Sequence, residues 1–214
     1  MSRIIDRGLE EQTVLIVKMG ELTYEALAIS IHGYLERKSV QVQVRDLSDI
    51  LVSMGEKVED EAFQLIARFQ PVATDLRTIK SYMKVGNDFV RYGRYALDIC
   101  IINDQLSGLK ECESWTRDYI NEMSEKVLSM VRTSIDALKK QDIVLAKTIS
   151  STEREVDKMY FDYLNKLINT EHANNKCVIS SALMTRYLER IADHAVYVCE
   201  SIVYIVTGEK VTLG

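Results

Sequence analysis

Apolar residues recur at three- and four-residue spacing along almost the whole chain, and very little in the sequence can interrupt a helix. One proline, Pro71, and nine glycines are spread over 214 residues. Residues that favour helix over strand, chiefly Ala, Leu, Glu, Lys and Met, occupy much of the rest. The chain is therefore expected to be all-α.

Local breakers divide this periodic sequence into six expected helices. Pro71 lacks an amide hydrogen and clashes with the preceding turn, so it ends one helix, and Thr74 with Asp75 can cap the next. The expected helices span residues 6–38, 43–69, 74–105, 112–141, 143–169 and 174–207.

The last expected helix of each half repeats one short phrase. FVRYGRYALDIC, residues 89–100, is nearly repeated in YLERIADHAVYV, residues 187–198, where Arg190 matches Arg91 and Ala195 matches Ala96 at an offset of 99. In the middle helices an offset of 98 aligns Glu59 with Asp157, although it also aligns Gly55 with Glu153. The repetition indicates an internal duplication.

The duplication predicts two tandem three-helix bundles related by a pseudo-two-fold axis. Glycine-serine punctuation in QLSGLKE, residues 105–111, separates the halves, so the expected domains are 1–107 and 108–214. A single irregular long bundle is the alternative architecture.

Charge and cysteine usage restrict function and compartment. Acids outnumber bases by 32 to 27, giving a formal net charge of −5, and no basic face for nucleic acid is indicated. The four cysteines form no CxxC pair, and Cys100 and Cys199 lie in apolar helical patterns where a reduced thiol behaves as a small hydrophobe. No 18-residue apolar span and no cleavable leader occur. We expect a soluble protein of a reducing cytoplasm, without direct membrane insertion.

Four acids of the second half form two pairs at i,i+4 spacing. Glu153 and Asp157 lie in one expected helix, and Glu189 and Asp193 lie in the next. Residues i and i+4 share a helix face, so the members of each pair repel each other. Carboxylates brought together from two neighbouring helices form a hard oxygen-donor site suited to magnesium, calcium, manganese or iron.

Arginines on the same helix offer these acids a competing partner. Arg186 and Arg190 stand three residues before Glu189 and Asp193, at the spacing of an ordinary helical ion pair. His194 points away from Asp193 and off the apolar stripe, which favours a surface or interface role over metal ligation. No Ser-His-Asp order and no phosphate-cradling glycine loop occur, so an enzyme is not expected.

Two stretches resemble the PhoU family of phosphate-uptake regulators. ARFQPVATDLRTI, residues 67–79, is similar to the family's QP-x-A-x-D-L-R junction, and TRYLERIADHAVYVCESIVYIVTGE, residues 185–209, is similar to its second-repeat signature. STEREVDKMY, residues 151–160, is a fair match, whereas the first 60 residues match only in helical pattern. The resemblance implies two tandem bundles able to carry metal on ExxxD motifs. It also implies a cytoplasmic accessory of the high-affinity phosphate ABC transporter that restrains uptake.

The resemblance carries over residue by residue only in the second half. By type and spacing, the implied metal ligands are Glu153, Asp157, Glu189 and Asp193. The implied metal is iron, with zinc, magnesium, manganese and calcium as alternatives. The implied partners are the transporter's ATPase subunit and, in some systems, a sensor kinase, and a homodimer is a further expectation.

In the first half, Val90 and Arg94 stand where the third-helix acids belong, so a metal site is expected on the second bundle only. The guanidinium of Arg94 is hypothesised to replace the cation opposite the acids of the neighbouring helix, Glu56, Glu59 or Asp60.

The preferred interpretation is a regulatory binding protein. Two alternatives belong to other classes: a purely structural helical scaffold, and a carboxylate-bridged metalloenzyme or metal-storage bundle. The latter chemistry normally uses Glu-x-x-His pairs, and this chain contains none.

Overall fold

The computed structural model describes residues 3–106, 108–109, 112–171 and 174–214, and its regular secondary structure is entirely helical. The helices are α1 (Ile4–Glu36), α2 (Gln41–Phe69), α3 (Ala73–Leu106), α4 (Ser114–Lys140), α5 (Ile143–Lys147), α6 (Ile149–Ile168) and α7 (Asn175–Thr207). The all-α prediction is confirmed, and the helix ends agree with the expected ranges to within about two residues.

Helix ends follow local chemistry, except that Thr74 and Asp75, which were expected to cap the third helix, lie inside it. Helix α2 ends at Phe69, and Gln70 takes a left-handed conformation with φ of 46° before Pro71. Thr74 and Asp75 lie inside the first turn of α3, where Asp75 accepts a hydrogen bond from Arg3 Nη1 at 2.8 Å. The side chains of Asp142 and Asn174 accept backbone hydrogen bonds at the starts of α5 and α7.

The expected fifth helix, 143–169, is present and is interrupted at Thr148. The backbone N–H of Thr148 donates to the carbonyl of Leu145 at 3.1 Å, and its side-chain hydroxyl donates to the same carbonyl at 2.7 Å. This tighter turn breaks the regular i→i−4 ladder and separates the short α5 from α6.

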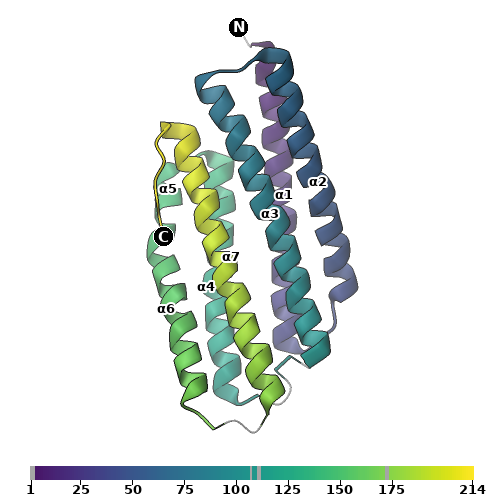
Figure 1. The fold of residues 1–214 in the computed structure, drawn as a ribbon, viewed down its shortest axis with the longest axis vertical. Helices are drawn as coiled ribbons and strands as arrows, with labels where there is room; N and C mark the ends of the chain where they lie inside the picture. The colour runs from purple at the N-terminus through teal and green to yellow at the C-terminus, as the bar shows by residue number, and fades with distance from the viewer. Residues whose placement is uncertain (1–2, 107, 110–111, 172–173) are drawn as a thin grey trace.

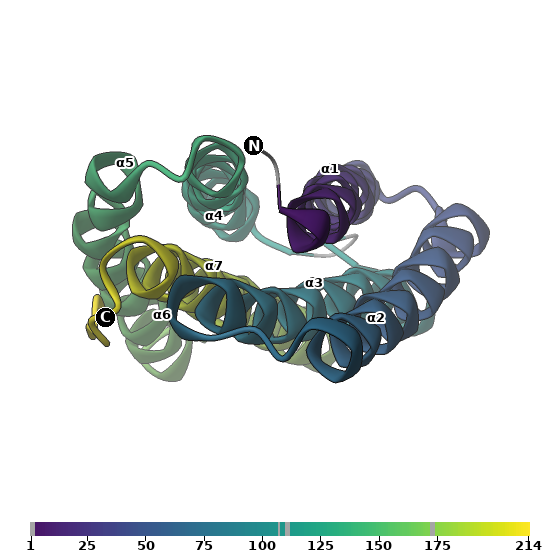
Figure 2. The same cartoon turned by 90° about the horizontal axis from the view of Figure 1, so that it is seen from above.

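Two bundles stand side by side, one built from α1–α3 and the other from α4–α7 (Figure 1). Seen from above, α3 and α7 occupy the centre, with α2 flanking α3 and α6 flanking α7, while α1 and α4 cover one face (Figure 2). The expected boundary between 107 and 108 lies partly outside the described residues, because residue 107 is not described.

The central helices run antiparallel and meet as a two-fold relation requires. Asp88 of α3 lies against His194 of α7, and Tyr95 of α3 packs on Tyr187 of α7 with ring centroids 5.8 Å apart. An offset of 99 residues converts the first pair of positions into the second. One large cluster of buried residues then continues through both bundles, from Phe89 of α3 to helix α7.

A disulfide joins Cys112 to Cys177, with the two Cα atoms 5.4 Å apart and a sequence separation of 65. It links the connection before α4 to the first turn of α7. Cys100 and Cys199 are free and buried, as their apolar patterns predicted. The disulfide was not expected, because its partners are far apart in sequence and form no motif. Among the described residues, no helix is both long and apolar enough to cross a bilayer.

Candidate metal centre

Three of the four predicted ligands meet where α6 packs against α7. Glu153 and Asp157 come from α6, and Asp193 comes from α7. One carboxylate oxygen from each residue lies within 4.8 Å of the other two. We call these three residues the acid cluster.

Glu153 is the most deeply placed acid of the cluster, with 7% of its surface exposed. It shares the buried face of α6 with Ile149 and Val156, at spacings of four and three residues, so the apolar side of the helix carries it inward. Its Oε2 atom is buried without a hydrogen-bond partner among the described residues. Burial raises the pKa of Glu153, and repulsion by Asp157 and Asp193 raises it further.

Asp193 completes the cluster from α7. Burial is the main cause that raises its pKa, and the nearby Asp157 adds to the effect. The positive ends of Arg186 and Arg190 oppose the rise, but no ion pair joins Asp193 to either arginine within the described chain.

Glu189 lies beside the acid cluster and outside it. Arg186 Nη1 donates to Glu189 Oε2 at 2.6 Å, so this acid has the helical ion pair that its spacing allowed. Burial still raises the pKa of Glu189, and so does the charge of Asp193. Its role as a fourth ligand stays a prediction.

The donor set of the cluster fits a hard cation. Its atoms are all carboxylate oxygens, and one of them is buried without a partner among the described residues. Burial, and then repulsion between like charges, raises the pKa of two of its three members, Glu153 and Asp193. A cation bound between these carboxylates would give the buried oxygen a partner and would reduce the repulsion between the acids.

The segment after α7 lies along one side of the cluster. Leu213 N donates to Glu200 Oε1 at 3.1 Å, which holds the segment against α7. A Cβ atom built on Gly214 would stand 3.2 Å from Glu153 Oε1, so the backbone of Gly214 lies close to that carboxylate.

His194 is an interface residue, as predicted. Its Nδ1 lies 2.8 Å from Asp88 Oδ1, and its Nε2 lies 3.3 Å from the hydroxyl of Tyr95, both on α3. The sequence reading missed Asp88, which is only 6% exposed. Its place beside Val85 and Phe89 in the buried face of α3 was the available signal.

In the first bundle, the position that corresponds to the acid cluster is filled by apolar contact between α2 and α3. Gly55 and Val90 occupy the positions that correspond to Glu153 and Glu189, and a Cβ on Gly55 would come within 2.7 Å of Val90 Cγ2. Arg94 instead lines a shallow hollow that also includes Asp98. No ion pair to Glu56, Glu59 or Asp60 supports the substitute-cation hypothesis in the part of the chain that is described.

Comparison with known proteins matches both halves of the chain. The model of the PhoU domain fits residues 16–102 and again residues 120–202. A phosphate-specific transport system accessory protein PhoU homolog of Clostridium acetobutylicum is 30% identical, over 99% of this chain and 98% of that protein. The corresponding homolog of Pseudomonas putida is 27% identical, over 99% of this chain and 84% of its own length.

Solved structures give the same fold. The crystal structure of PhoU from Pseudomonas aeruginosa superposes with a TM-score of 0.89 at 27% identity, covering 95% of this chain and 99% of its own. The regulatory protein PhoU from Streptococcus pneumoniae superposes with a TM-score of 0.76 at 20% identity, covering 97% of this chain and 99% of its own.

Proposed function

Because the chain belongs to the PhoU family, we propose that it is a regulator that restrains phosphate uptake through a phosphate ABC transporter. The observation that carries the proposal is the family match in both halves of one two-bundle fold. The relatives are named accessory proteins of phosphate-specific transport systems, which supports a role beside a transporter.

The proposed regulator works by contact and not by catalysis. Its proposed partners are the ATPase subunit of the transporter and a sensor kinase, and a second copy of the chain is a further proposed partner. The proposed location is the cytoplasm, where these partners would be met.

A metal ion on the second bundle belongs to the same proposal. Glu153, Asp157 and Asp193 would hold it, and Glu189 would join them if Arg186 released it. Iron is the first candidate, followed by zinc, magnesium, manganese and calcium. The ion would supply positive charge that offsets the repulsion within the cluster. The residues themselves would then hold α6 against α7 in one geometry, which a partner could recognise.

Phosphate uptake by cells that lack the protein tests the role in transport. We expect such cells to take up labelled phosphate faster than the parent when external phosphate is plentiful, and the wild-type gene to restore restraint. Unchanged uptake in the deletion strain would overturn the regulatory proposal. Capture of the transporter's ATPase from the same cells by tagged protein tests the partner separately.

A matched pair of variants separates the metal from the scaffold alternative. D157N/D193N removes two acids of the cluster, whereas D162N removes an acid from the exposed pair that Asp162 forms with Lys158 on α6. We expect elemental analysis to find metal in the wild type and D162N and to find it lost in D157N/D193N. Equal metal in all three would place the ion outside the acid cluster, and no metal in any of them would leave the scaffold alternative.

A further inference from the structure

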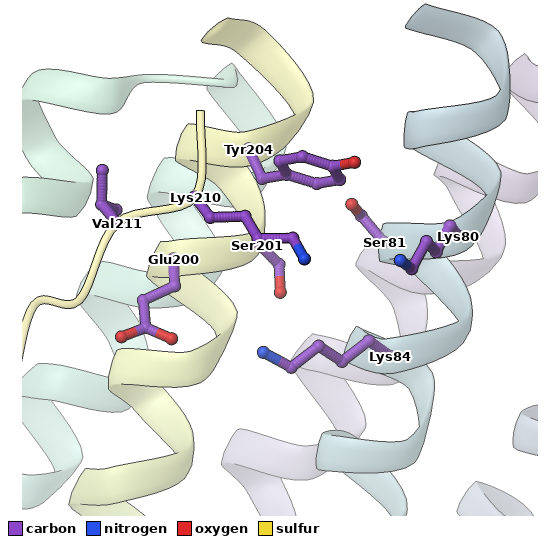
Figure 3. Close-up of a pocket in the computed structure, with 8 residues that line it drawn as sticks. All are labelled: Lys80, Ser81, Lys84, Glu200, Ser201, Tyr204, Lys210 and Val211. Atoms are coloured by element: carbon purple, nitrogen blue, oxygen red, sulfur yellow. The ribbon is translucent and has the colours of Figure 1, made fainter. Parts of the chain in front are cut away.

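A second charged feature, which shares no residue with the acid cluster, lies between the two bundles (Figure 3). Here α3, α7 and the segment after α7 enclose a pocket of about 330 Å³. The residues that line it are Lys80, Ser81, Lys84, Glu200, Ser201, Tyr204, Lys210 and Val211. Pockets that hold small molecules begin at about 300 Å³, so this one has room for a ligand larger than a single ion.

Three lysine side chains reach this pocket from two different elements. Lys80 and Lys84 extend from α3, and Lys210 extends from the segment after α7, so that the three ammonium groups approach one space (Figure 3). Within the described residues, no acid forms an ion pair with any of the three. Positive charge is thus concentrated here on a chain whose net charge is −5.

The one acid of the pocket is occupied elsewhere. Glu200 Oε1 accepts a hydrogen bond from the backbone N–H of Leu213 at 3.1 Å, and no ion pair joins its carboxylate to a lysine among the described residues. Lys84 Nζ also lies over the ring of Tyr197, 5.4 Å from the ring centroid. The three lysines outnumber the one acid of the pocket, so net positive charge remains for a ligand.

Hydroxyl groups line the deeper part of the pocket. Ser81 and Ser201 face each other from α3 and α7 and are 3% and 4% exposed. Ser201 donates its own proton to the carbonyl of Tyr197 at 2.8 Å. The hydroxyls of Ser81 and Tyr204 have no hydrogen-bond partner assigned among the described residues, so both remain able to donate to a ligand.

The internal duplication does not explain the lysines. At the offset of 99 residues, Ser81 corresponds to Ser180, another buried serine in the contact between the copies. Lys80 and Lys84 correspond instead to Ile179 and Leu183. Packing of α3 on α7 therefore requires the small residue and does not require the two charges.

We propose that this pocket binds a small anion that carries a diphosphate group, of the pyrophosphate or nucleoside diphosphate class. Three ammonium groups match the charge of a diphosphate, and lysine binds phosphate oxygens as a point charge. The ring of Tyr204 and the side chain of Val211 form an apolar wall beside the lysines, against which a nucleoside would pack. The bound anion joins the first copy to the second, because its contacts come from both.

Calorimetric titration of the metal-free full-length chain tests the proposal. ADP and pyrophosphate are titrated separately at about 0.1 M salt, so that weak surface attraction is screened. Sulfate serves as the anion without a diphosphate. We expect one site per chain for ADP or pyrophosphate and much weaker binding of sulfate. Tighter binding of ADP identifies a nucleoside diphosphate, and equal or tighter binding of pyrophosphate identifies the inorganic ion.

Matched lysine variants locate the site. K84Q/K210Q removes two pocket charges, and the control K139Q/K158Q removes two exposed lysines from other surfaces. We expect affinity to fall by at least about tenfold in K84Q/K210Q and to stay unchanged in the control. Lys210 lies after the end of α7, so the single variant K210Q removes a pocket charge without changing any helix, and we expect it to weaken binding as well. The proposal is overturned if neither ligand binds, if the pocket variants bind like the wild type, or if the control loses as much affinity.

Discussion

Glu153 holds a position that an apolar residue would fill in an ordinary amphipathic helix. Its neighbours on the same face of α6 are Ile149 and Val156, yet its own carboxylate oxygen is buried without a partner. Such a group costs free energy unless positive charge or a proton satisfies it. The residue therefore links stability to ion binding in a single side chain.

The substitution E153Q separates these two effects. In metal-free protein we expect it to raise the free energy of unfolding by about 1 kcal/mol, because it removes a buried charge without a partner. Metal content should fall at the same time. The control E155Q removes an exposed acid paired with Lys126, and we expect it to change neither quantity appreciably. Denaturant unfolding and elemental analysis measure the two effects, and a destabilised metal-free E153Q would contradict this account.

The raised pKa values of Glu153, Glu189 and Asp193 also predict a pH dependence. In metal-free protein the folded state retains protons that the unfolded chain has already released near the ordinary values of 4.5 for Glu and 3.8 for Asp. Stability contributed by these groups therefore falls as pH rises from those values through the raised ones. Unfolding curves between about pH 4 and pH 7 should show a steeper decline for wild type than for E153Q. Parallel declines would refute this origin.

At the scale of elements, α7 organises the second bundle. It presents Asp193 to α6, His194 to α3 and, at its first turn, Cys177 to the connection before α4. The disulfide closes a loop of 65 residues and so restricts the unfolded chain more than the folded one. Such bonds are uncommon in a reducing cytosol, so a stable disulfide here would argue against the proposed cytoplasmic location.

Reduction of the Cys112–Cys177 disulfide should lower the free energy of unfolding, because it frees the loop in the unfolded chain. The chain-entropy estimate for a loop of 65 residues is about 4 kcal/mol of unfolding free energy, as an upper value. We expect dithiothreitol to lower the denaturation midpoint of wild type and to leave C112S/C177S unchanged. Thiol titration of unfolded, unreduced protein should count the two free cysteines, Cys100 and Cys199. A count of four would show that the bond does not form.

The whole molecule joins two similar bundles through one core. Buried residues of α3 and α7 form a single cluster, and the pair of Asp88 and His194 sits within that contact. The two halves are repeats in sequence, but they share one hydrophobic core and are expected to fold together. The boundary between 107 and 108 stays a prediction.

One cooperative unfolding transition is the expected consequence. Trp115, the only tryptophan, lies in α4 and reports on the second bundle alone, whereas far-UV circular dichroism reports on both. The two signals should follow the same curve with denaturant. A tryptophan transition separated from the dichroism transition would mean that the bundles unfold independently.

Periodicity and breakers were sufficient to predict the helices, because apolar spacing and a single proline leave few alternatives. Spacing also predicted that Glu153 and Asp157 share a face, since i and i+4 always do. It could not choose between Arg186 and the acid cluster as the partner of Glu189, because that depends on the rotamers of long side chains. Features that join distant segments, such as the disulfide and the lysine pocket, have no local signal and appear only when α3, α7 and their connections are placed.

Six residues after α7, 209–214, touch both charged features of the molecule. Lys210 reaches the pocket, Leu213 is tethered to Glu200, and Gly214 rests against Glu153. One short segment of the chain therefore contacts both the pocket and the acid cluster. If a ligand in the pocket shifts this segment and so changes the affinity of the carboxylates for an ion, thermodynamic linkage requires the ion to change the affinity of the pocket for its ligand by the same factor.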